Sequence, residues 1–158
     1  MANALIIYYS RSGNTEKMAQ IIKESIEKEG IKTELKRIEK TQVKDLLTAD
    51  AIIIGSPVYY GGMAAQLKQL LDESVAHHGA LDGKIGGAFS SSANIGGGNE
   101  TTILDILNAF LIHGMIIQGD PMGDHYGPVS INQPDTRAEK QCARFGQRIV
   151  KLIKKLRN

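Results

Sequence analysis

With 158 residues, 42% of them hydrophobic, the chain is long enough for one well-packed domain, and no shift in composition predicts a second. A formal net charge of only +2 is too small to imply binding to nucleic acid or to an anionic membrane by itself, and the single cysteine excludes an internal disulfide. No segment predicts a signal peptide or a membrane span. We therefore expect one domain over residues 1–158, in the cytoplasm, with no nucleic-acid partner and no membrane insertion.

Apolar runs alternate with amphipathic segments along the chain. Strands are predicted over residues 4–9, 33–37, 51–55, 85–89 and 115–118. Helices are predicted over residues 15–29, 65–75, 100–112 and 138–156, with a short packing segment at 43–47 and a Gly- and Pro-rich loop at 119–135. This alternation predicts an α/β fold with a doubly wound parallel sheet, because right-handed crossovers place helices on both of its faces.

Three loops of this predicted sheet share an unusual composition. They follow the first, third and fourth strands, and their sequences are SRSGNT (10–15), SPVYYGG (56–62) and SSSANIGGG (90–98). Ligands of doubly wound sheets bind beyond the carboxyl ends of the strands, where such loops meet. We therefore interpret the three Gly- and Ser-rich loops as three walls of one site.

The first of these loops has the features of an anion site. It precedes a helix, whose first-turn N–H groups have no partner within the helix and whose dipole favours negative charge. Hydroxyl groups come from Ser10, Ser12 and Thr15, an amide comes from Asn14, and Gly13 lets the backbone turn closely. The loop is predicted to hold a phosphate.

Several phosphate-binding classes can be excluded on residues. The first loop has neither the lysine of a P-loop nor the GxGxxG spacing of a dinucleotide fingerprint, and the acidic residues of a phosphorylated receiver domain are missing. Cys142 lies far from the loop on the apolar face of the last helix, which favours a core thiol over a nucleophile. His77 and His78 cannot share a helix face, so no metal site is predicted. A flat cofactor with a phosphate tail fits all three loops.

Four segments of the chain resemble flavodoxin-like FMN proteins, most closely the WrbA-type NAD(P)H:quinone oxidoreductases. In chain order they are YYSRSGNTEKMA, GSPVYYGGMAAQLKQLLDE, FSSSANIGGGNETTILDILNAFLIHGMIIQG and NQPDTRAEKQCARFGQRIVKLIKKL. The resemblance implies a flavodoxin-like five-stranded parallel sheet of order 2-1-3-4-5. It also implies cofactor-binding residues, namely Ser10, Arg11, Ser12, Gly13, Asn14, Thr15, Pro57, Val58, Tyr59, Tyr60, Gly61, Ser91, Ser92, Ala93, Asn94, Gly97, His125 and Tyr126.

The resemblance further places His113 near the flavin, as a catalytic hydrogen-bond donor that can come across a subunit contact. The alternative for His113 is a capping or packing residue at a helix C-terminus. For Tyr59 and Tyr60 the alternative is aromatic packing in a turn, and for His125 and Tyr126 it is a surface loop. The chain departs from the family in two ways. It is shorter than the family pattern before the third strand and after the fifth strand, and it has Tyr59 at a position where the family commonly has arginine.

The charge distribution favours one reaction class. Neither predicted ring loop contains an acid, and the sequence pI is near 8.6, so a reduced, negatively charged flavin would meet little repulsion. We therefore expect a hydride to pass from NAD(P)H through FMN to a quinone or similar acceptor. The alternatives are an electron carrier between partner proteins and an FMN-binding module without enzymatic activity. The resemblance also implies a homodimer or homotetramer.

Overall fold

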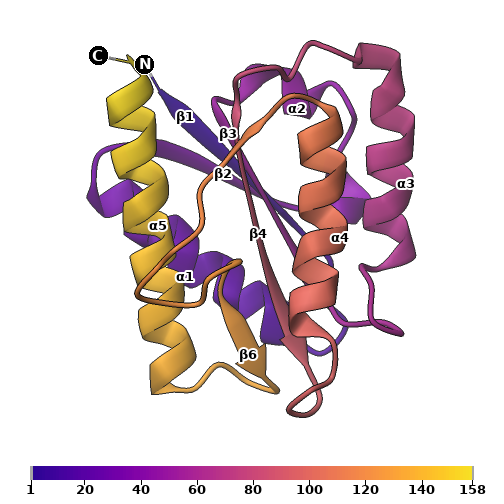
Figure 1. Cartoon of the computed structure of the whole chain (residues 1–158), viewed down its shortest axis with the longest axis vertical. Helices are drawn as coiled ribbons and strands as arrows, with labels where there is room; N and C mark the ends of the chain where they lie inside the picture. Colours follow the sequence, from indigo (N-terminus) through magenta and orange to yellow (C-terminus); the bar gives the residue numbers. More distant parts are fainter. Residues whose placement is uncertain (1, 158) are drawn as a thin grey trace.

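A parallel β-sheet forms the centre of the protein in the computed structural model, which describes residues 2–157 (Figure 1). All neighbouring strands of the sheet run parallel, and their order is β2-β1-β3-β4-β5. The strands are β1 (Asn3–Tyr8), β2 (Lys32–Arg37), β3 (Ala51–Pro57), β4 (Ile85–Ser92), β5 (Ile116–Ile117) and β6 (Val129–Ile131). The predicted flavodoxin-like topology is confirmed.

The last position in the sheet is shared by two short strands. β5 pairs with the start of β4 through Ile85 and Ile116, and β6 pairs with its end through Ser92 and Ile131. The sequence reasoning missed β6 inside its predicted loop, because three residues after Pro128 are too few to show a strand pattern. It also ended β4 three residues early, since the serines at 90–92 do not look like buried strand residues.

Helices cover both faces of this sheet. The α-helices are α1 (Asn14–Lys28), α2 (Asp45–Thr48), α3 (Ala65–Glu73), α4 (Asn99–Ile112) and α5 (Thr136–Arg157), with 3-10 turns η1 (Ile38–Lys40) and η2 (Ser74–His77). α1 and α5 lie together on one face, and α3 and α4 lie on the other (Figure 1). None of the helices within residues 2–157 combines the length and apolar character needed to span a membrane.

Strand residues alternate between two separate cores. Ile6 and Ile53 are fully buried in the core beneath α1 and α5, while Ile7 and Ile54 are fully buried beneath α3 and α4. Strands that are buried on both faces read as continuous apolar runs, which explains the pattern in the sequence. Cys142 lies in the first core, where burial raises the pKa of its thiol to about 12. It is an unreactive packing residue, as predicted.

Candidate functional site

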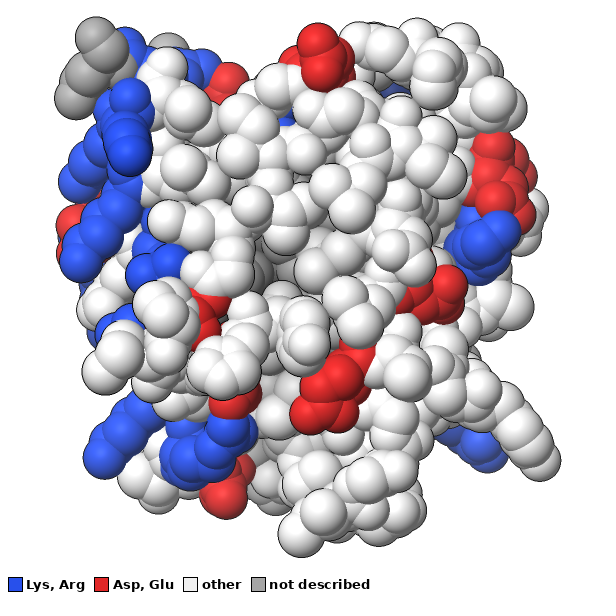
Figure 2. All heavy atoms as spheres, in the orientation of Figure 1, with Lys and Arg blue, Asp and Glu red and all other residues white. Residues whose placement is uncertain are grey.

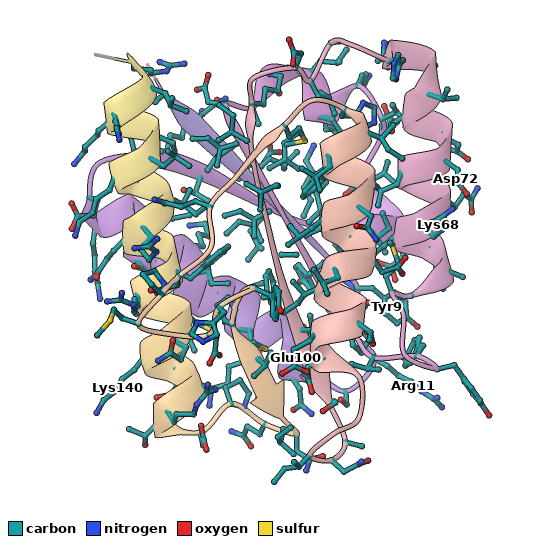
Figure 3. All side chains as sticks on the ribbon, in the orientation of Figure 1. Tyr9, Arg11, Lys68, Asp72, Glu100 and Lys140 are labelled. Carbon is teal, nitrogen blue, oxygen red and sulfur yellow. The ribbon has the colours of Figure 1, made fainter. Side chains whose placement is uncertain are left out.

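The three Gly- and Ser-rich loops meet at the carboxyl edge of the sheet around a cleft of about 240 Å³. The residues that line this cleft are Ser10, Arg11, Ser12, Asn14, Thr15, Pro57, Val58, Tyr59, Ser91, Ser92, Ala93 and Asn132. Figure 3 shows Tyr9, Arg11 and Glu100 at this end of the molecule. The structure therefore brings together most of the predicted cofactor residues, although they come from three distant parts of the chain.

The first wall is the turn from β1 into α1. Gly13 has a φ of 93°, and its N–H donates to Ser10 Oγ at 3.0 Å, while its carbonyl accepts the first helical bond from Lys17 at 3.0 Å. No side chain caps α1. Within residues 2–157, the backbone N–H groups of Asn14 and Thr15 have no acceptor. Because Ser10 Oγ accepts from Gly13, its own proton is also free for an anion.

The second wall is a tight reverse turn after β3. Tyr59 and Gly62 exchange two backbone hydrogen bonds of 3.0 and 3.1 Å, and the two residues between them, Tyr60 and Gly61, have φ values of 49° and 78°. A bulky residue rarely adopts a positive φ, so the surroundings must hold Tyr60 there. Thr101 Oγ1 does so by donating to the Gly61 carbonyl at 2.7 Å. The turn is therefore fixed to the start of α4.

Aromatic contact joins the second wall to the first. The rings of Tyr9 and Tyr59 meet edge to face, with their centroids 5.9 Å apart. Tyr59 remains 40% exposed and lines the cleft, whereas the Tyr60 side chain is fully exposed at the tip of the turn. Tyr59 can therefore offer part of its ring to a ligand in the cleft, and Tyr60 stands at its rim.

The third wall is the end of β4 and the turn that follows it. Thr15 Oγ1 and Ser91 Oγ lie 2.8 Å apart in a buried hydrogen bond that joins the first and third walls. The turn closes through the N–H of Gly97, which donates to the Asn94 carbonyl at 3.1 Å. A Cβ at Gly97 would lie only 2.8 Å from that carbonyl oxygen, so the turn requires glycine.

Two asparagines in this wall were not singled out by the sequence reasoning. Asn99 is buried at the start of α4 and donates from Nδ2 to the Ser90 carbonyl at 3.2 Å. Asn132 lines the cleft and donates from Nδ2 to the Ala93 carbonyl at 3.2 Å. Asn99 directly follows three glycines, which is a usable signal for a helix start, but nothing in the sequence marks Asn132.

His125 and Tyr126 lie outside the cleft. They line a neighbouring hollow of about 300 Å³, together with Glu100 and Arg137. Ion pairs hold their loop to α5: Arg137 binds Asp124, and Arg144 binds Asp120 with one bond of 2.8 Å. The hydrogen bonds from Arg144 keep the pKa of Asp120 far below its usual range. The predicted contact of His125 and Tyr126 with a flavin therefore stays a prediction.

His113 is not part of the cleft in this chain. It follows the last residue of α4, at the opposite edge of the sheet, and is only 7% exposed. Ser74 donates its hydroxyl proton to the Leu71 carbonyl at 2.6 Å, so Nε2 of His113 must donate to Ser74 Oγ at 2.7 Å. Burial, and then His78, lower the pKa of His113. His113 therefore packs at the end of α4 and does not line the cleft of its own subunit, and a role toward a flavin across a subunit contact stays a prediction.

The cleft carries little charge. Of the residues that line it, Arg11 alone is charged, and none has a carboxylate. Nor does the described part of the chain contain a group of three or more His, Cys, Asp or Glu side chains arranged to hold a metal ion. The arrangement can therefore bind an anionic tail through N–H and hydroxyl groups and enclose an uncharged body between the second and third walls.

Comparison with known proteins agrees with this geometry. Residues 5–99 match the family described as Flavodoxin domain. The chain belongs to the flavodoxin family. It is 36% identical to a flavodoxin from Aquifex aeolicus (strain VF5) over 162 aligned residues, which cover 97% of this chain and 88% of that protein.

Relatives with a different name are similar at a slightly lower identity. The chain is 32% identical to an NAD(P)H dehydrogenase (quinone) from Sinorhizobium fredii (strain NBRC 101917 / NGR234), with 99% of each chain covered. That alignment spans 197 positions, so the relative carries segments that this flavodoxin-family chain lacks. The crystal structure of the flavodoxin, WrbA-like protein from Agrobacterium tumefaciens shares the fold, with a TM-score of 0.82, 24% identity, and coverage of 98% of this chain and 99% of that one.

Proposed function

We propose that this protein is an FMN-dependent oxidoreductase that passes a hydride from NAD(P)H, through bound FMN, to a quinone or a similar small acceptor. The observation that carries the proposal is the cleft between three loops, which has no carboxylate among its lining residues and has unused N–H groups at the turn 10–15. Relatives named NAD(P)H dehydrogenase (quinone) support the donor and the acceptor. FMN supplies the redox chemistry when it is bound, so the protein has to bind, orient and shield it.

The residues of the cleft fit FMN. A terminal phosphate suits the turn at 10–15, where Asn14 and Thr15 present unpartnered N–H groups and Ser10 presents a free hydroxyl proton. A Cβ built on Gly13 meets nothing within 4 Å, which leaves the space above the turn open for a ligand. The second and third walls would then hold the ring, with Tyr59 as an aromatic face and Ser91, Ala93 and the 94–97 turn along its edge.

The lack of carboxylates in the cleft favours two-electron chemistry. A carboxylate about 4 Å from the ring would oppose the negative charge gained on reduction by roughly 1–4 kcal/mol. No residue that lines the cleft supplies such a charge, and Arg11 adds a positive one. We infer that the protein lets the ring accept a full hydride more readily than an acidic carrier would.

Anaerobic stopped-flow measurements test this function. The FMN-loaded protein is mixed with NADH or NADPH, and then with a quinone, while the flavin absorbance is followed. We expect loss of the oxidised flavin spectrum with at least one nicotinamide, and its return with the quinone. Free FMN at the same concentration is the control. A colourless protein that rejects added FMN, or a loaded protein that neither nicotinamide reduces, would contradict the proposal.

A second candidate is an electron carrier between partner proteins. It is favoured by chain length, because the flavodoxin from Clostridium saccharobutylicum aligns over 158 positions with 96% of this chain and 97% of its own. The longer quinone dehydrogenases carry extra segments instead. A carrier would exchange electrons quickly with a ferredoxin or its reductase and oxidise NAD(P)H negligibly. The stopped-flow comparison therefore separates the two functions.

We further propose that the protein works in the cytoplasm as a homodimer or homotetramer. Val75, Leu111 and Ile112 are 71, 60 and 72% exposed near the far end of α3 and α4, which is a large apolar area for a free surface. Figure 2 shows that Lys and Arg side chains gather along the α5 side, whereas the face over α4 is mostly uncharged. Sedimentation velocity at micromolar concentration tests the assembly, and a monomer would contradict it.

A further inference from the structure

An arginine from the edge strand lies beneath the phosphate turn, outside the cleft. Arg37 is the last residue of β2, which pairs with β1 directly before the turn. Its Nη2 donates to the carbonyl oxygen of Ser10 at 2.8 Å, and its guanidinium lies 5.6 Å from the centroid of the Tyr8 ring. It is not among the residues that line the cleft. The cation therefore holds the turn from behind and does not face the ligand.

The hydrogen bond to Ser10 fixes the direction of the next N–H group. In a trans peptide the carbonyl and the following N–H point in opposite directions, and no described peptide bond is cis. When Arg37 holds the Ser10 carbonyl on its own side, the N–H of Arg11 must point away from Arg37. Ser10 and Arg11 both line the cleft, so this N–H is directed to the side where the phosphate would bind.

Arg37 also forms an ion pair with a carboxylate in the first turn of α1. Glu16 lies two residues after the start of the helix, and its charge would repel a bound phosphate. Its carboxylate accepts a hydrogen bond from the Tyr8 hydroxyl at 2.7 Å and lies 3.6 Å from Nη1 of Arg37. Together these contacts hold the acid under the turn, partly neutralised and away from the anion side.

We propose that Arg37 is the positioning residue for the phosphate of the cofactor, because it sets the Ser10–Arg11 peptide with its N–H facing the anion. The proposal rests on FMN binding as proposed above. It predicts that Arg37 contributes to the affinity for FMN but not to the affinity for riboflavin, which has the same ring without the phosphate. The residue acts without touching the cofactor, and so the two ligands distinguish positioning from general stability.

Titration of the apoprotein with FMN and with riboflavin tests this role. Loss of a hydrogen bond from a charged group should raise the dissociation constant for FMN about 10-fold in Arg37→Ala. The dissociation constant for riboflavin should change less than about 2-fold, because that ligand does not use the turn. Arg157→Ala is the matched control, since Arg157 also pairs with a carboxylate, that of Asp50, but at the other end of the sheet. It should leave both constants unchanged.

A charge effect is separated from positioning by a second variant. Arg37 pairs with Glu39 as well as Glu16, its Nε lying 3.3 Å from the Glu39 carboxylate. Adding Glu16→Gln and Glu39→Gln to Arg37→Ala removes both acids, yet the peptide stays unfixed, so most of the loss in FMN affinity should remain. Full recovery in this triple variant would overturn the positioning role. In a direct measurement, adding inorganic phosphate should shift the amide signal of Arg11 in the NMR spectrum of the wild-type apoprotein, and not in Arg37→Ala.

The outcomes for function and for positioning are distinct. If the wild-type protein binds neither FMN nor phosphate, the proposed function itself is wrong. If it binds FMN more tightly than riboflavin, and Arg37→Ala preserves both that ratio and its melting temperature, the function stands and the role of Arg37 is wrong. A folded Arg37→Ala protein that loses affinity for both ligands equally would also overturn it.

Discussion

The two ends of α4 are built alike and behave differently. At its start, the buried Asn99 is hydrogen-bonded to Ser90, and just after its end, the buried His113 is hydrogen-bonded to Ser74. Around Asn99, however, neighbouring loops leave N–H groups of Asn14 and Thr15 unused beside an open cleft. Around His113, a groove of about 500 Å³ runs between α3 and α4 with mainly apolar walls. The unused groups differ as well: backbone N–H donors face the cleft near Asn99, whereas at the other end the unused atom is Nδ1 of His113, a residue that lines the groove. Several free N–H donors around one cleft suit an anionic ligand, and a single imidazole nitrogen does not.

The largest effect on FMN binding is expected from a substitution in the turn 10–15, at the start of α1. Gly13→Val should raise the dissociation constant for FMN about 100-fold, because a β-branched side chain disfavours the φ of 93° and displaces the N–H groups around it. Fluorescence titration measures the change. Gly79→Val is a matched control, because Gly79 has a φ of 86° and equally open space around it. It should lose similar stability and keep its FMN affinity; equal affinity in the two variants would refute the phosphate site.

Alkaline pH should weaken the carboxyl edge of the sheet. Burial and then the hydrogen bond to Glu16 raise the pKa of Tyr8 from 10.0 to about 12. Tyr8 ionises near pH 10 in the unfolded chain and only near pH 12 in the folded one. Its contribution to folding stability is therefore fully present below pH 10 and is lost as the pH rises to 12. The loss amounts to about 2–3 kcal/mol of unfolding free energy.

Urea unfolding at pH 8, 10 and 11.5 measures this loss. Other groups also ionise in this range, so the comparison is between the wild-type protein and Tyr8→Phe. The variant should lose less stability than the wild type between pH 10 and 11.5. Parallel curves for the two proteins would show that Tyr8 is not held in its neutral form.

Acid should lower the stability of the other end of the sheet, where His113 is buried. The pKa of His113 is lowered in the folded protein, mainly by burial. Its contribution to folding stability is therefore fully present above the ordinary pKa of about 6.5 and is lost as the pH falls through the folded pKa. His113→Gln should cost about 1–2 kcal/mol at pH 7, because the hydrogen bond to Ser74 is weakened. It should also flatten the dependence of stability on pH below 6.5.

Flavin binding gives the decisive control for this variant. The loaded His113→Gln protein should keep its FMN affinity and its turnover within about 2-fold, since the residue lies far from the cleft. If turnover fell strongly while stability stayed unchanged, His113 would reach a flavin by another route, such as the flavin of a second subunit.

The smallest effect is expected for the charged residue of the cleft. Arg11 is exposed, and solvent screens its charge, so Arg11→Ala should weaken FMN binding by less than about 3-fold. Isothermal titration at low and high salt measures the change. A loss as large as that of Gly13→Val would mean that the side chain of Arg11, and not the backbone N–H groups, is the main partner of the phosphate.

The central strands and the three walls of the cleft were predictable from the sequence. Continuous apolar runs gave the central strands, and the shared composition of three loops gave the three walls. The limits of β4 and the existence of β6 were not predictable, because the serines at 90–92 become strand residues only through pairing with β3 and β6. Pairing between distant segments leaves no periodic signal in so short a stretch.

His113 and the overlooked residues show two different limits of the sequence. The family resemblance implies a place near the flavin for His113, whereas in its own chain α4 carries the residue to the end of the sheet away from the cleft, so its contact with a flavin stays a prediction. Arg37 and Asn132 were overlooked because they act through backbone carbonyls, those of Ser10 and Ala93. A residue that supports a loop by bonding its backbone needs no particular neighbours in the sequence, so only the structure reveals it.

The placement of the aromatic residues gives the protein a built-in optical reporter. The chain has no tryptophan and five tyrosines, Tyr8, Tyr9, Tyr59, Tyr60 and Tyr126. Tyr8 ends β1, Tyr9 and Tyr59 are in contact between the first two walls, Tyr60 is at the tip of the second, and Tyr126 lines the adjoining hollow. Tyrosine emission therefore comes from the ligand-binding end of the sheet, and ligands or local opening there can be followed without any label.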